Sequence, residues 1–524
     1  MDPLAEALKR PEAYPHETGT IEVVETHISL LFLTESYAYK IKKPVNLGFL
    51  DFSTLELRKH FCHEELRLNR RLCPDIYLSV VPVVEWQGKL FLDRPGEIVD
   101  YAVKMVRFDR TMELDRMIAS GRLERRHIDL LADIVTGFHK GLPQDASGSG
   151  FGMPENLIRP MMENFQHMEP AASDAGEEEE LLALKGWTLK EHERLRPIFL
   201  ERKQDGFIRP CHGDMHTGNM VWWRNSILIF DCIEFNEDLS IIDVTSDLAF
   251  LFMDLEHAGK PAFAWRILNR WLQATGDYQS LRLLRFYALY RAMVRAKVTA
   301  IRYGQSTGKA SAQKALDEHR SYLELARRYT LRQQAVLVIT FGVSGSGKSH
   351  WSAELAERLP AVHLRSDIER KRLVGLDPLQ RSQREIYSAE MTRATYRRML
   401  DIAESCLREG IAVIADATFL DLSTRKQFIE LATRCGSPCG ILGFEAPVEI
   451  LGKRVEKRYR EGRDASEADI KVLYGQLERR EPLSSSEEAL CIKVNSAGIV
   501  DISSIAAKLN CLRERVRQLK SDEG

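Results

Sequence analysis

The chain has 524 residues, which is too long for a single hydrophobic core, so two or three domains are expected. Its residues are 44% hydrophobic and 29% charged, a composition typical of a soluble globular protein. The 74 basic and 76 acidic residues nearly cancel, so no overall electrostatic field indicates nucleic acid or a membrane as the partner.

The first residues, MDPLAEALKRPEAYPHE, contain acidic groups and prolines and lack the apolar core of a secretory signal. The apolar runs AVLVITFGV and DLAFLFMDLE are far shorter than the ~20 residues that span a bilayer. Nine cysteines, an odd number scattered along the chain, suit a reducing compartment better than a disulfide framework. We therefore expect a cytoplasmic protein without a membrane partner.

Residues 20 to about 107 have the pattern of strands around one helix. The runs ISLLFLT and YAYKIKK are separated only by Glu35 and Ser36, which predicts a tight hairpin. A helix is predicted through LELRKHFCHEELRLNRRL, and its inward face is expected to hold Leu57, Phe61, Leu68 and Leu72. Two further strands are expected in LSVVPVVEW and VDYAVKMVRF.

The remainder of the chain divides into a helical part and an alternating part. Residues 111 to 325 are predicted to be mostly helical, and the apolar run LRLLRFYALYRAMVRAKVTAIRY is expected to close the core of that domain. From AVLVITFGV onward, buried strands alternate with helices, as in a parallel sheet covered by helices. We place the domain boundary near residue 330, giving domains 1–328 and 330–524.

The second domain opens with a phosphate-binding motif, G-x-x-x-x-G-K-[ST], placed between a buried strand and an amphipathic helix. The motif reads Gly342-Val343-Ser344-Gly345-Ser346-Gly347-Lys348-Ser349. Its glycines let backbone N–H groups point at phosphate oxygens. We predict that these residues bind ATP, that Lys348 reaches the β- and γ-phosphates, and that Ser349 binds Mg²⁺.

Carboxylates follow the next two strands of this domain. Because ligands bind beyond the carboxyl ends of parallel strands, Asp367 and Asp416 are expected in the catalytic zone. Asp367 is predicted to orient and deprotonate an acceptor hydroxyl, with a helix N-cap as its alternative role. Asp416 is predicted to hold the metal through its water shell, and Arg425, just beyond it, is a candidate for binding the acceptor.

Arginines recur in the later segment LGKRVEKRYREGRDASEAD. If this segment closes over the nucleotide, Arg454, Arg458 and Arg463 would stabilise charge that develops on the transferred phosphoryl group. A solvated helical face is the alternative interpretation of these arginines.

The motifs GVSGSGKS, SD-x-x-R, DAT and R-x-x-x-R-x-x-x-x-R-D-A-S resemble the P-loop kinases related to polynucleotide kinase and zeta toxins. The resemblance implies that Asp367 is the base, that Arg370 binds the acceptor, and that Arg454 and Arg458 occupy a lid. Members phosphorylate RNA or DNA ends, nucleotide sugars or small metabolites. A nucleic-acid partner therefore stays open for this domain.

A second catalytic pattern lies in the first domain. The segment CHGDMHTGN has the D-x-x-x-x-N spacing of a kinase catalytic loop, with Asp214 as base and Asn219 as metal ligand. After the strand ILIF comes Asp231, where kinases place a second metal-binding aspartate.

The phosphate-binding lysine of this domain is expected upstream. Lys40 ends the strand segment YAYK, which is similar to the kinase segment V-A-I-K, and is predicted to bind the α- and β-phosphates of ATP. Its partner on the following helix is predicted to be Glu65, with Glu64 as the neighbouring candidate.

The loop H-G-D-x-H-x-x-N, followed by D-x-x-E-F, resembles the aminoglycoside phosphotransferase family, with choline kinase among its relatives. The resemblance implies a protein-kinase-like fold, with an N-lobe at about 1–107 and a C-lobe at about 108–328. It also implies that Asp247 braces the catalytic loop. Two departures are that no G-x-G-x-x-G precedes Lys40 and that Cys-Ile, not Phe-Gly, follows Asp231.

The predicted architecture is thus an α+β bilobal protein-kinase-like domain followed by an α/β P-loop domain with a parallel sheet. This pairing resembles bacterial fusion proteins described as predicted kinases. The leading hypothesis is a bifunctional kinase in which each domain transfers the γ-phosphoryl of Mg·ATP to a hydroxyl. One alternative is a catalytic P-loop domain regulated by a nucleotide-sensing first domain. Another is a nucleic-acid end kinase with a docking domain. The sequence leaves the acceptor and the oligomeric state open.

Overall fold

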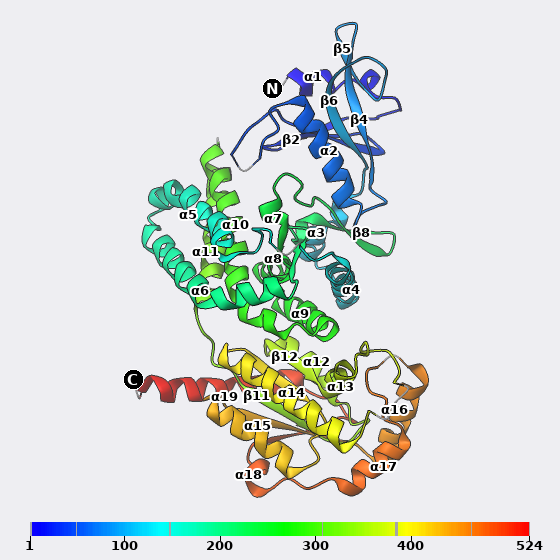
Figure 1. Cartoon of the computed structure of the whole chain (residues 1–524), viewed down its shortest axis with the longest axis vertical. Helices are drawn as coiled ribbons and strands as arrows, with labels where there is room; N and C mark the ends of the chain where they lie inside the picture. The colour runs from blue at the N-terminus through cyan, green and yellow to red at the C-terminus, as the bar shows by residue number, and fades with distance from the viewer. Residues whose placement is uncertain are drawn as a thin grey trace. The chain divides into compact units, whose positions relative to one another are not determined.

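The computed structural model describes residues 3–48, 50–145, 148–306, 308–382, 386–462 and 464–522. Their contacts divide the chain into two compact units (Figure 1). Unit 1 comprises Met1–Leu130, Gly137–Asp254 and Lys297–Ala312. Unit 2 comprises Leu131–Thr136, Leu255–Ala296 and Gln313–Gly524.

Unit 1 begins with a six-stranded antiparallel sheet of order β1-β2-β3-β6-β4-β5. Its strands are β1 (Glu22–Glu25), β2 (Ser29–Leu33), β3 (Tyr37–Lys42), β4 (Tyr77–Trp86), β5 (Lys89–Leu92) and β6 (Glu97–Val106). The predicted hairpin is confirmed, because Leu33 on β2 pairs with Ala38 on β3 across the turn. The short helix α1 (Pro3–Ala7) contacts β5.

The helix α2 (Leu55–Asn69) packs on β6 and β4, and Leu68 is buried as predicted, whereas Leu57 and Phe61 are only half-buried. Thr54 caps its first turn by accepting a hydrogen bond from the N–H of Leu57. Glu65 lies on the buried face, as expected for the partner of Lys40, and Arg58 lies there as well, which was not predicted. The apolar periodicity missed this because Arg58 finds a buried partner in Asp100, 2.9 Å away.

Residues 108–257 are mostly helical, as predicted, with two short β pairs among the helices. The helices are α3 (Leu114–Ala119), α4 (Arg125–Gly141), α5 (Pro154–Ala175), α6 (Glu178–Gln204), α7 (Glu237–Ser240) and α8 (Val244–His257). The strand pairs are β7 (Ile208–Pro210) with β10 (Ile241–Asp243), and β8 (Met220–Trp223) with β9 (Ser226–Ile229). The acidic residues 178–180 form the first turn of α6, where negative charge is favourable.

Unit 2 is built on a parallel sheet of order β12-β13-β11-β14-β15, which confirms the predicted α/β class. Its strands are β11 (Leu337–Phe341), β12 (Ala361–Arg365), β13 (Ala412–Asp416), β14 (Cys439–Glu445) and β15 (Cys491–Asn495). The central strand β11 is fully buried. The edge strand β15 was not predicted, because its residues are mostly half-buried or exposed and form no apolar run.

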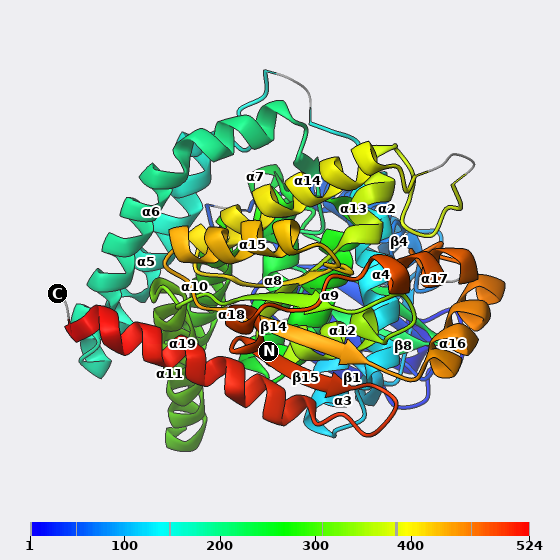
Figure 2. The same ribbon diagram turned by 90° about the horizontal axis from the view of Figure 1, so that it is seen from below.

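Helices cover both faces of this sheet (Figure 2). On one face, α12 (Lys348–Arg358) and α19 (Ile502–Asp522) pack together and share an apolar core with the strands. On the other face lie α14 (Ala389–Arg408) and α15 (Leu422–Arg434). The remaining helices of the P-loop region are α13 (Ser366–Leu373), α16 (Val448–Glu461), α17 (Ile470–Arg479) and α18 (Ser485–Glu488).

Helices that precede residue 330 also belong to unit 2. They are α9 (Pro261–Thr275), the first part of α10 (Leu281–Gln305) and most of α11 (Lys309–Thr330). Of these, α9 packs against α12 and β12. The apolar part of α10 was expected to close the core of the first domain, whereas the contacts assign residues 281–296 to unit 2. Its apolar pattern shows burial but not which core the helix joins.

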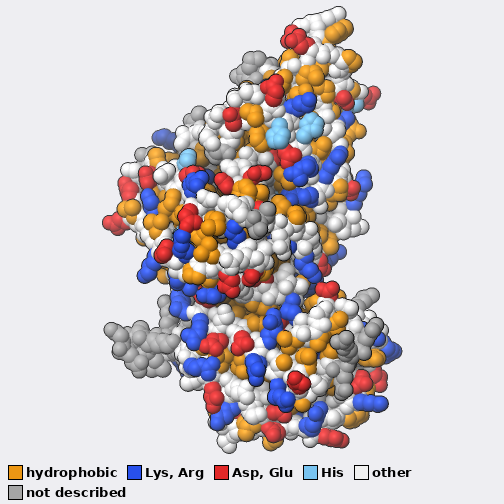
Figure 3. Space-filling view, viewed as in Figure 1, with side chains coloured by type: hydrophobic (Ala, Val, Ile, Leu, Met, Phe, Trp, Pro, Cys, Tyr) orange, Lys and Arg blue, Asp and Glu red, His pale blue; other side chains and the backbone are white. Residues whose placement is uncertain are grey.

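Basic and acidic side chains are interspersed on the visible face (Figure 3), in agreement with their nearly equal numbers. Within the residues that the structure describes, no helix combines the length and the apolarity needed to cross a membrane.

Candidate active sites

The first candidate site starts from Lys40 on β3. Its ammonium lies 2.9 Å from Glu65 Oε1 and 2.6 Å from Asp231 Oδ1, so the predicted partners meet. Burial would lower the pKa of Lys40, but the charges of Asp231 and Glu65 outweigh it and raise that pKa well above its usual value. The neighbouring candidate Glu64 instead pairs with Arg67 on the helix surface.

A second lysine on the same strand face, Lys42, was not predicted to belong to this site. Lys42 is only 1% exposed in its side chain, and its ammonium lies 2.7 Å from Glu65 Oε2 and also pairs with Glu234. Two lysines therefore hold the one carboxylate of Glu65 and lower its pKa against the effect of burial. The strand period of two, which places Lys42 on the same face as Lys40, was the available signal.

The catalytic loop brings its predicted residues together. Asn219 Nδ2 donates to the main-chain oxygen of Asp214 at 3.0 Å and to Asp214 Oδ2 at 2.9 Å. Both of these atoms are acceptors, so the amide is oriented with Oδ1 as its ligand atom. The side chains of Asp214 and Asp231 are 32% and 46% exposed. Three oxygen donors of this kind fit a hard cation such as Mg²⁺.

Buried carboxylates brace this loop. Asp247 accepts hydrogen bonds from the N–H groups of His212, at 3.1 Å, and Gly213, at 2.9 Å. Its Oδ2 also lies 3.2 Å from His139 Nε2. Gly213 has φ 85°, and a Cβ there would stand 2.8 Å from a main-chain oxygen, so only glycine fits. Asp254 holds the far end of the loop by accepting from the N–H of Thr217 at 2.8 Å.

The turn between β1 and β2 stands where a glycine-rich loop covers the phosphates in protein kinases. The N–H of Thr26 donates to the oxygen of Ser29 at 2.9 Å, and Thr26 Oγ1 accepts from the N–H of Ser29 at 2.9 Å. The turn is therefore closed on itself by its own side chain. Phosphate binding at this site would depend on Lys40 and a metal ion.

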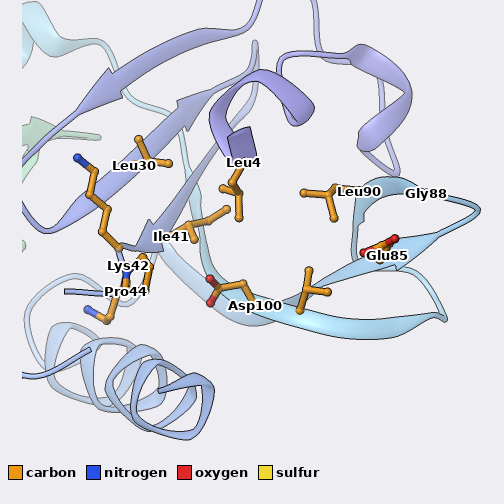
Figure 4. A pocket seen from close by; sticks show the side chains of 11 residues that line it. Leu4, Leu30, Ile41, Lys42, Pro44, Glu85, Gly88, Leu90 and Asp100 are labelled. Atoms are coloured by element: carbon orange, nitrogen blue, oxygen red, sulfur yellow. The ribbon is translucent and has the colours of Figure 1, made fainter. Parts of the chain in front are cut away.

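A cavity of about 490 Å³ in the same sheet shares Lys42 with the cluster around Glu65 (Figure 4). Its lining includes Leu4, Leu30, Ile41 and Leu90. Because Ile41 is adjacent to Lys40 on β3, their side chains point to opposite faces of the sheet. The apolar lining of the cavity thus lies on the face away from Lys40.

The second candidate site is the phosphate loop between β11 and α12. A Cβ at Gly342 or Gly345 would stand 2.7 Å from a main-chain oxygen, so the chain can follow this path only with glycine. Lys348 Nζ donates to the oxygen of Val343 at 2.8 Å and to Ser346 Oγ at 3.3 Å. The remaining loop residues, Ser344, Gly347 and Ser349, complete the predicted cradle at the N-terminus of α12.

Electrostatics tie Lys348 to the strand-end carboxylates. Burial lowers the pKa of Lys348 to about 8, while the charges of Asp416 and Asp367 act to raise it. Burial alone would raise the pKa of Asp416, but hydrogen bonds from His363 and Ser349 and the charge of Arg365 reduce it to about 2. The carboxylate of Asp416 is thus an anion beside the predicted magnesium ligand Ser349, which suits a divalent cation.

Asp367 lies in the first turn of α13, at the carboxyl end of β12. The N-cap position belongs to Arg365, so the structure does not give Asp367 the alternative role of N-cap. The side chain of Asp367 is half-buried, and its charge acts on Lys348, Arg365 and Tyr387. This location allows the predicted role as base.

Arg370, one turn further along α13, is 7% exposed. Its Nη1 donates to the oxygen of Ile386 at 3.3 Å and to Thr392 Oγ1 at 3.2 Å, and its guanidinium lies 5.0 Å from the ring centre of Tyr387. Its buried Nε has no hydrogen-bond partner among the described residues. A donor left over beside Asp367 suits the predicted binding of an acceptor.

The lid arginines lie on α16. Arg454 Nη1 donates to the oxygen of Gly345 in the phosphate loop at 3.3 Å, and Arg454 Nη2 donates to the oxygen of Ser496 at 2.8 Å. The charge of Arg458 acts on Lys348, and its Nη2 donates to the oxygen of Ala468 at 3.2 Å. Arg463 lies outside the described residues.

Arg425 was predicted to bind the acceptor, and the structure corrects this. Its side chain is fully buried and donates to Glu487 through Nε at 2.6 Å and through Nη2 at 3.2 Å. Its other donors bind the main-chain oxygens of Phe419, Leu420 and Pro482. All five N–H groups are therefore occupied, so Arg425 links buried groups within the core and has no donor left for a ligand.

Three further residues lie at or near the P-loop site, although no sequence motif predicts them there. Gln476 Oε1 accepts from the N–H of Ser344 at 2.7 Å. Arg480 lies 4.3 Å from the ring centre of Phe341, and its charge acts on Lys348. His363 lies inside β12, where an apolar residue would be expected. Their positions depend on tertiary packing rather than on local spacing.

Comparison with known proteins identifies two families along the chain. Residues 58–284 match the phosphotransferase enzyme family, and residues 337–483 match an AAA domain. Uncharacterised proteins of Mycobacterium bovis and Mycobacterium tuberculosis are 27% identical over 450 residues, which is 85% of this chain and 88% of each relative.

Solved structures of kinases resemble parts of the chain. A gluconokinase from Sinorhizobium meliloti 1021 is 18% identical over 37% of this chain and 99% of its own, with a TM-score of 0.26. The GDP complex of wild-type aminoglycoside 2′-phosphotransferase-IIIa is 12% identical over 62% of this chain and 99% of its own, with a TM-score of 0.36. The chain is an ATP-dependent kinase in which a region that matches the phosphotransferase enzyme family precedes a region that matches an AAA domain.

Proposed function

We propose that the chain is a bifunctional kinase whose two sites each transfer the γ-phosphoryl of ATP to a hydroxyl acceptor. The observation that carries the proposal is that each unit holds a complete set of a base, metal ligands and a phosphate-binding lysine. The set in unit 1 is Lys40, Asp214, Asn219 and Asp231, and the set in unit 2 is Lys348, Ser349, Asp367 and Asp416.

At the first site, Asp214 would accept the proton of the acceptor hydroxyl while Asn219 orients its carboxylate. Lys40 would bind the α- and β-phosphates, held in place by Glu65. Mg²⁺, bound through Asn219 and Asp231, would neutralise charge on the phosphates.

At the second site, Asp367 would be the base and Lys348 would bind the β- and γ-phosphates through its ammonium group. Ser349 and Asp416 would hold Mg²⁺, directly or through its water shell. Arg370 would position the acceptor, and Arg454 and Arg458 would balance charge on the transferred group.

We assign the first site to the predicted domain 1–328, with its lobes at 1–107 and 108–328. The second site belongs to the predicted domain 330–524. A small hydroxylated molecule is the proposed acceptor of each site, with a nucleic-acid end as the other candidate for the P-loop site. A cytoplasmic location is part of the proposal and rests on nine cysteines that are all free thiols.

The test is γ-³²P transfer by the full chain to a mixed panel of sugars, aminoglycosides, nucleosides and oligonucleotide ends. Asp214→Asn and Asp367→Asn should each remove one set of products and spare the other, with a loss of ~10²–10⁴ in rate. Asp75→Asn and Asp401→Asn, at exposed aspartates, serve as matched controls. If neither substitution at the candidate bases removes a product, the proposal is wrong.

One observation favours a second candidate function for unit 1. The closed turn between β1 and β2, where kinases carry a glycine-rich loop, suits a module that binds nucleotide without turnover. In that case Asp214→Asn would change no product while unit 1 still binds ATP. Asp367→Asn would then abolish all transfer.

A further inference from the structure

A side chain of helix α9 covers the edge of the P-loop sheet. Strand β12 stands at the end of the strand order, next to β13, so its outer edge would present unpaired main-chain groups. Asn269 on α9 donates from Nδ2 to the oxygen of Ala361 at 2.9 Å and accepts at Oδ1 from the N–H of His363 at 2.7 Å. The amide of Asn269 thus makes two hydrogen bonds with the main chain of β12 of the kind that a neighbouring strand would make. Both segments belong to unit 2.

One helical turn further on, Gln273 engages the same residue of β12. Its Nε2 donates to the oxygen of His363 at 3.0 Å and lies 3.4 Å from His363 Nδ1. The main-chain oxygen can only accept, so the atom facing it must be the amide nitrogen. That nitrogen can only donate, and Nδ1 of the neutral imidazole is therefore the acceptor.

The other ring nitrogen faces the candidate metal site. His363 Nε2 lies 3.0 Å from Asp416 Oδ2, with both side chains at most 4% exposed. With Nδ1 acting as acceptor, Nε2 carries the proton and donates it to the carboxylate. Asp416 in turn is hydrogen-bonded to Ser349, the last residue of the phosphate loop motif. A continuous chain of hydrogen bonds thus joins α9 to the P-loop.

We propose that Gln273 is a positioning residue for the P-loop site, because it selects the His363 tautomer that orients Asp416 toward Ser349 and the magnesium ion. The inference rests on the proposed function of that site. It assigns a role to a helix, α9, that falls inside the phosphotransferase match rather than the AAA match. Groups that orient metal-binding side chains typically contribute 10–100-fold to metal affinity or activity.

Two substitutions at one position separate tautomer selection from simple packing. Gln273→Met keeps the length of the side chain and removes its donors. Gln273→Glu replaces the donor with an acceptor, so Nδ1 would carry a proton in addition to that on Nε2, because the ring would then lie between two carboxylates. The positive imidazolium beside Asp416 would oppose a magnesium ion there. We expect Gln273→Glu to be the more damaging change for magnesium, although it is closer to glutamine in polarity.

The first measurement does not depend on activity. In the full chain labelled with ¹⁵N-histidine, the ring nitrogens of His363, assigned with His363→Gln, should show a protonated Nε2. In Gln273→Glu, Nδ1 should be protonated as well as Nε2. A wild-type His363 that is protonated at Nδ1, or an Nδ1 that stays unprotonated in Gln273→Glu, would overturn the proposal.

The second measurement is the Mg²⁺ concentration that gives half-maximal binding of a fluorescent ATP analogue, in a Lys40→Ala background that leaves the P-loop site. Roughly 10–100-fold more Mg²⁺ should be needed in Gln273→Glu. Arg266→Met is the control, because it breaks the 2.5 Å ion pair to Glu357 in the α9–α12 contact without touching β12. An equal shift in the control, or none in Gln273→Glu, would contradict the proposal.

These outcomes are distinguishable from failure of the proposed function. If the full chain forms no product that depends on Asp367, the assignment of phosphoryl transfer at this site is wrong. The tautomer and the Mg²⁺ requirement for nucleotide binding would still be measured in that case. Melting temperatures of each variant establish that the comparison is made between folded proteins.

Discussion

The ammonium of Lys42 lies 2.7 Å from Glu65 Oε2, on the oxygen of the carboxylate that does not face Lys40. Glu65 therefore serves two cations on one strand face, and the cluster is buried apart from Lys40 and Asp231. Such an arrangement fixes α2 against β3 in the geometry that the nucleotide site needs.

Lys42→Met should destabilise unit 1 by about 3–5 kcal/mol, because the substitution leaves the buried carboxylate of Glu234 without its cation. Urea unfolding followed by circular dichroism measures this loss. Lys43→Met is the matched control, since Lys43 pairs with the exposed Glu25 and should contribute only about 0–1 kcal/mol. Equal losses in the two variants would contradict the prediction.

Arg425→Met should lower the stability of unit 2 by about 3–5 kcal/mol, because Glu487 and several main-chain oxygens lose their buried donor. The KM for the acceptor should stay unchanged in the folded protein. Arg434→Met, at a side chain that is 61% exposed, should change stability by less than about 0.5 kcal/mol. A raised KM at intact stability would restore Arg425 as an acceptor ligand.

The pair of Glu487 and Arg425 should also make stability depend on pH. Burial would raise the pKa of Glu487, but hydrogen bonds from Arg425 and Ser484 outweigh it, and the folded pKa falls below the usual 4.5. The stabilisation is therefore complete above pH 4.5 and is lost as the pH falls through the folded pKa. In urea titrations, the stability difference between wild type and Glu487→Gln should shrink from about pH 5 to about pH 3. A constant difference would show that ionisation of Glu487 contributes nothing.

Lys348→Ala should abolish ATP binding at the P-loop, because the lysine and the loop amides form one phosphate cradle. Isothermal titration of the full chain with Mg·ATP should then find one bound nucleotide where the wild type has two. Lys457→Ala, at a side chain that is 73% exposed on α16, should keep both. Unchanged stoichiometry in Lys348→Ala would remove the P-loop from the binding assignment.

The residues that could be predicted from the sequence are those whose role follows from the spacing of residues within one short segment. The phosphate loop, the pair Asp214 and Asn219, and the strand-end Asp367 depend on short segments with defined backbone geometry. The partner of Lys40 on α2 could be predicted as well, because helical periodicity turns Glu65 inward and Glu64 outward.

Other residues depend on packing between distant segments. Arg425 follows a strand end in sequence, yet spacing does not tell the direction of its side chain, which points into the core. Gln476 on α17 bonds to the phosphate loop, and Arg480, at the C-cap of α17, packs on Phe341 just before that loop, and no motif predicts either contact. The edge strand β15 is short and mostly half-buried, so its pattern resembles that of a loop.

The two hydrogen bonds between Asn269 and the main chain of β12 limit how the gene can be recombined. A recombination event between the codons of Ala296 and Thr330 would deliver the P-loop region without α9. The main-chain edge of β12 would then be bare, and exposed strand edges promote aggregation. Breakpoints ahead of Leu255 would transfer the whole of unit 2 from α9 onward. We therefore expect viable chimaeras with distant relatives to inherit α9 and the P-loop from the same parent.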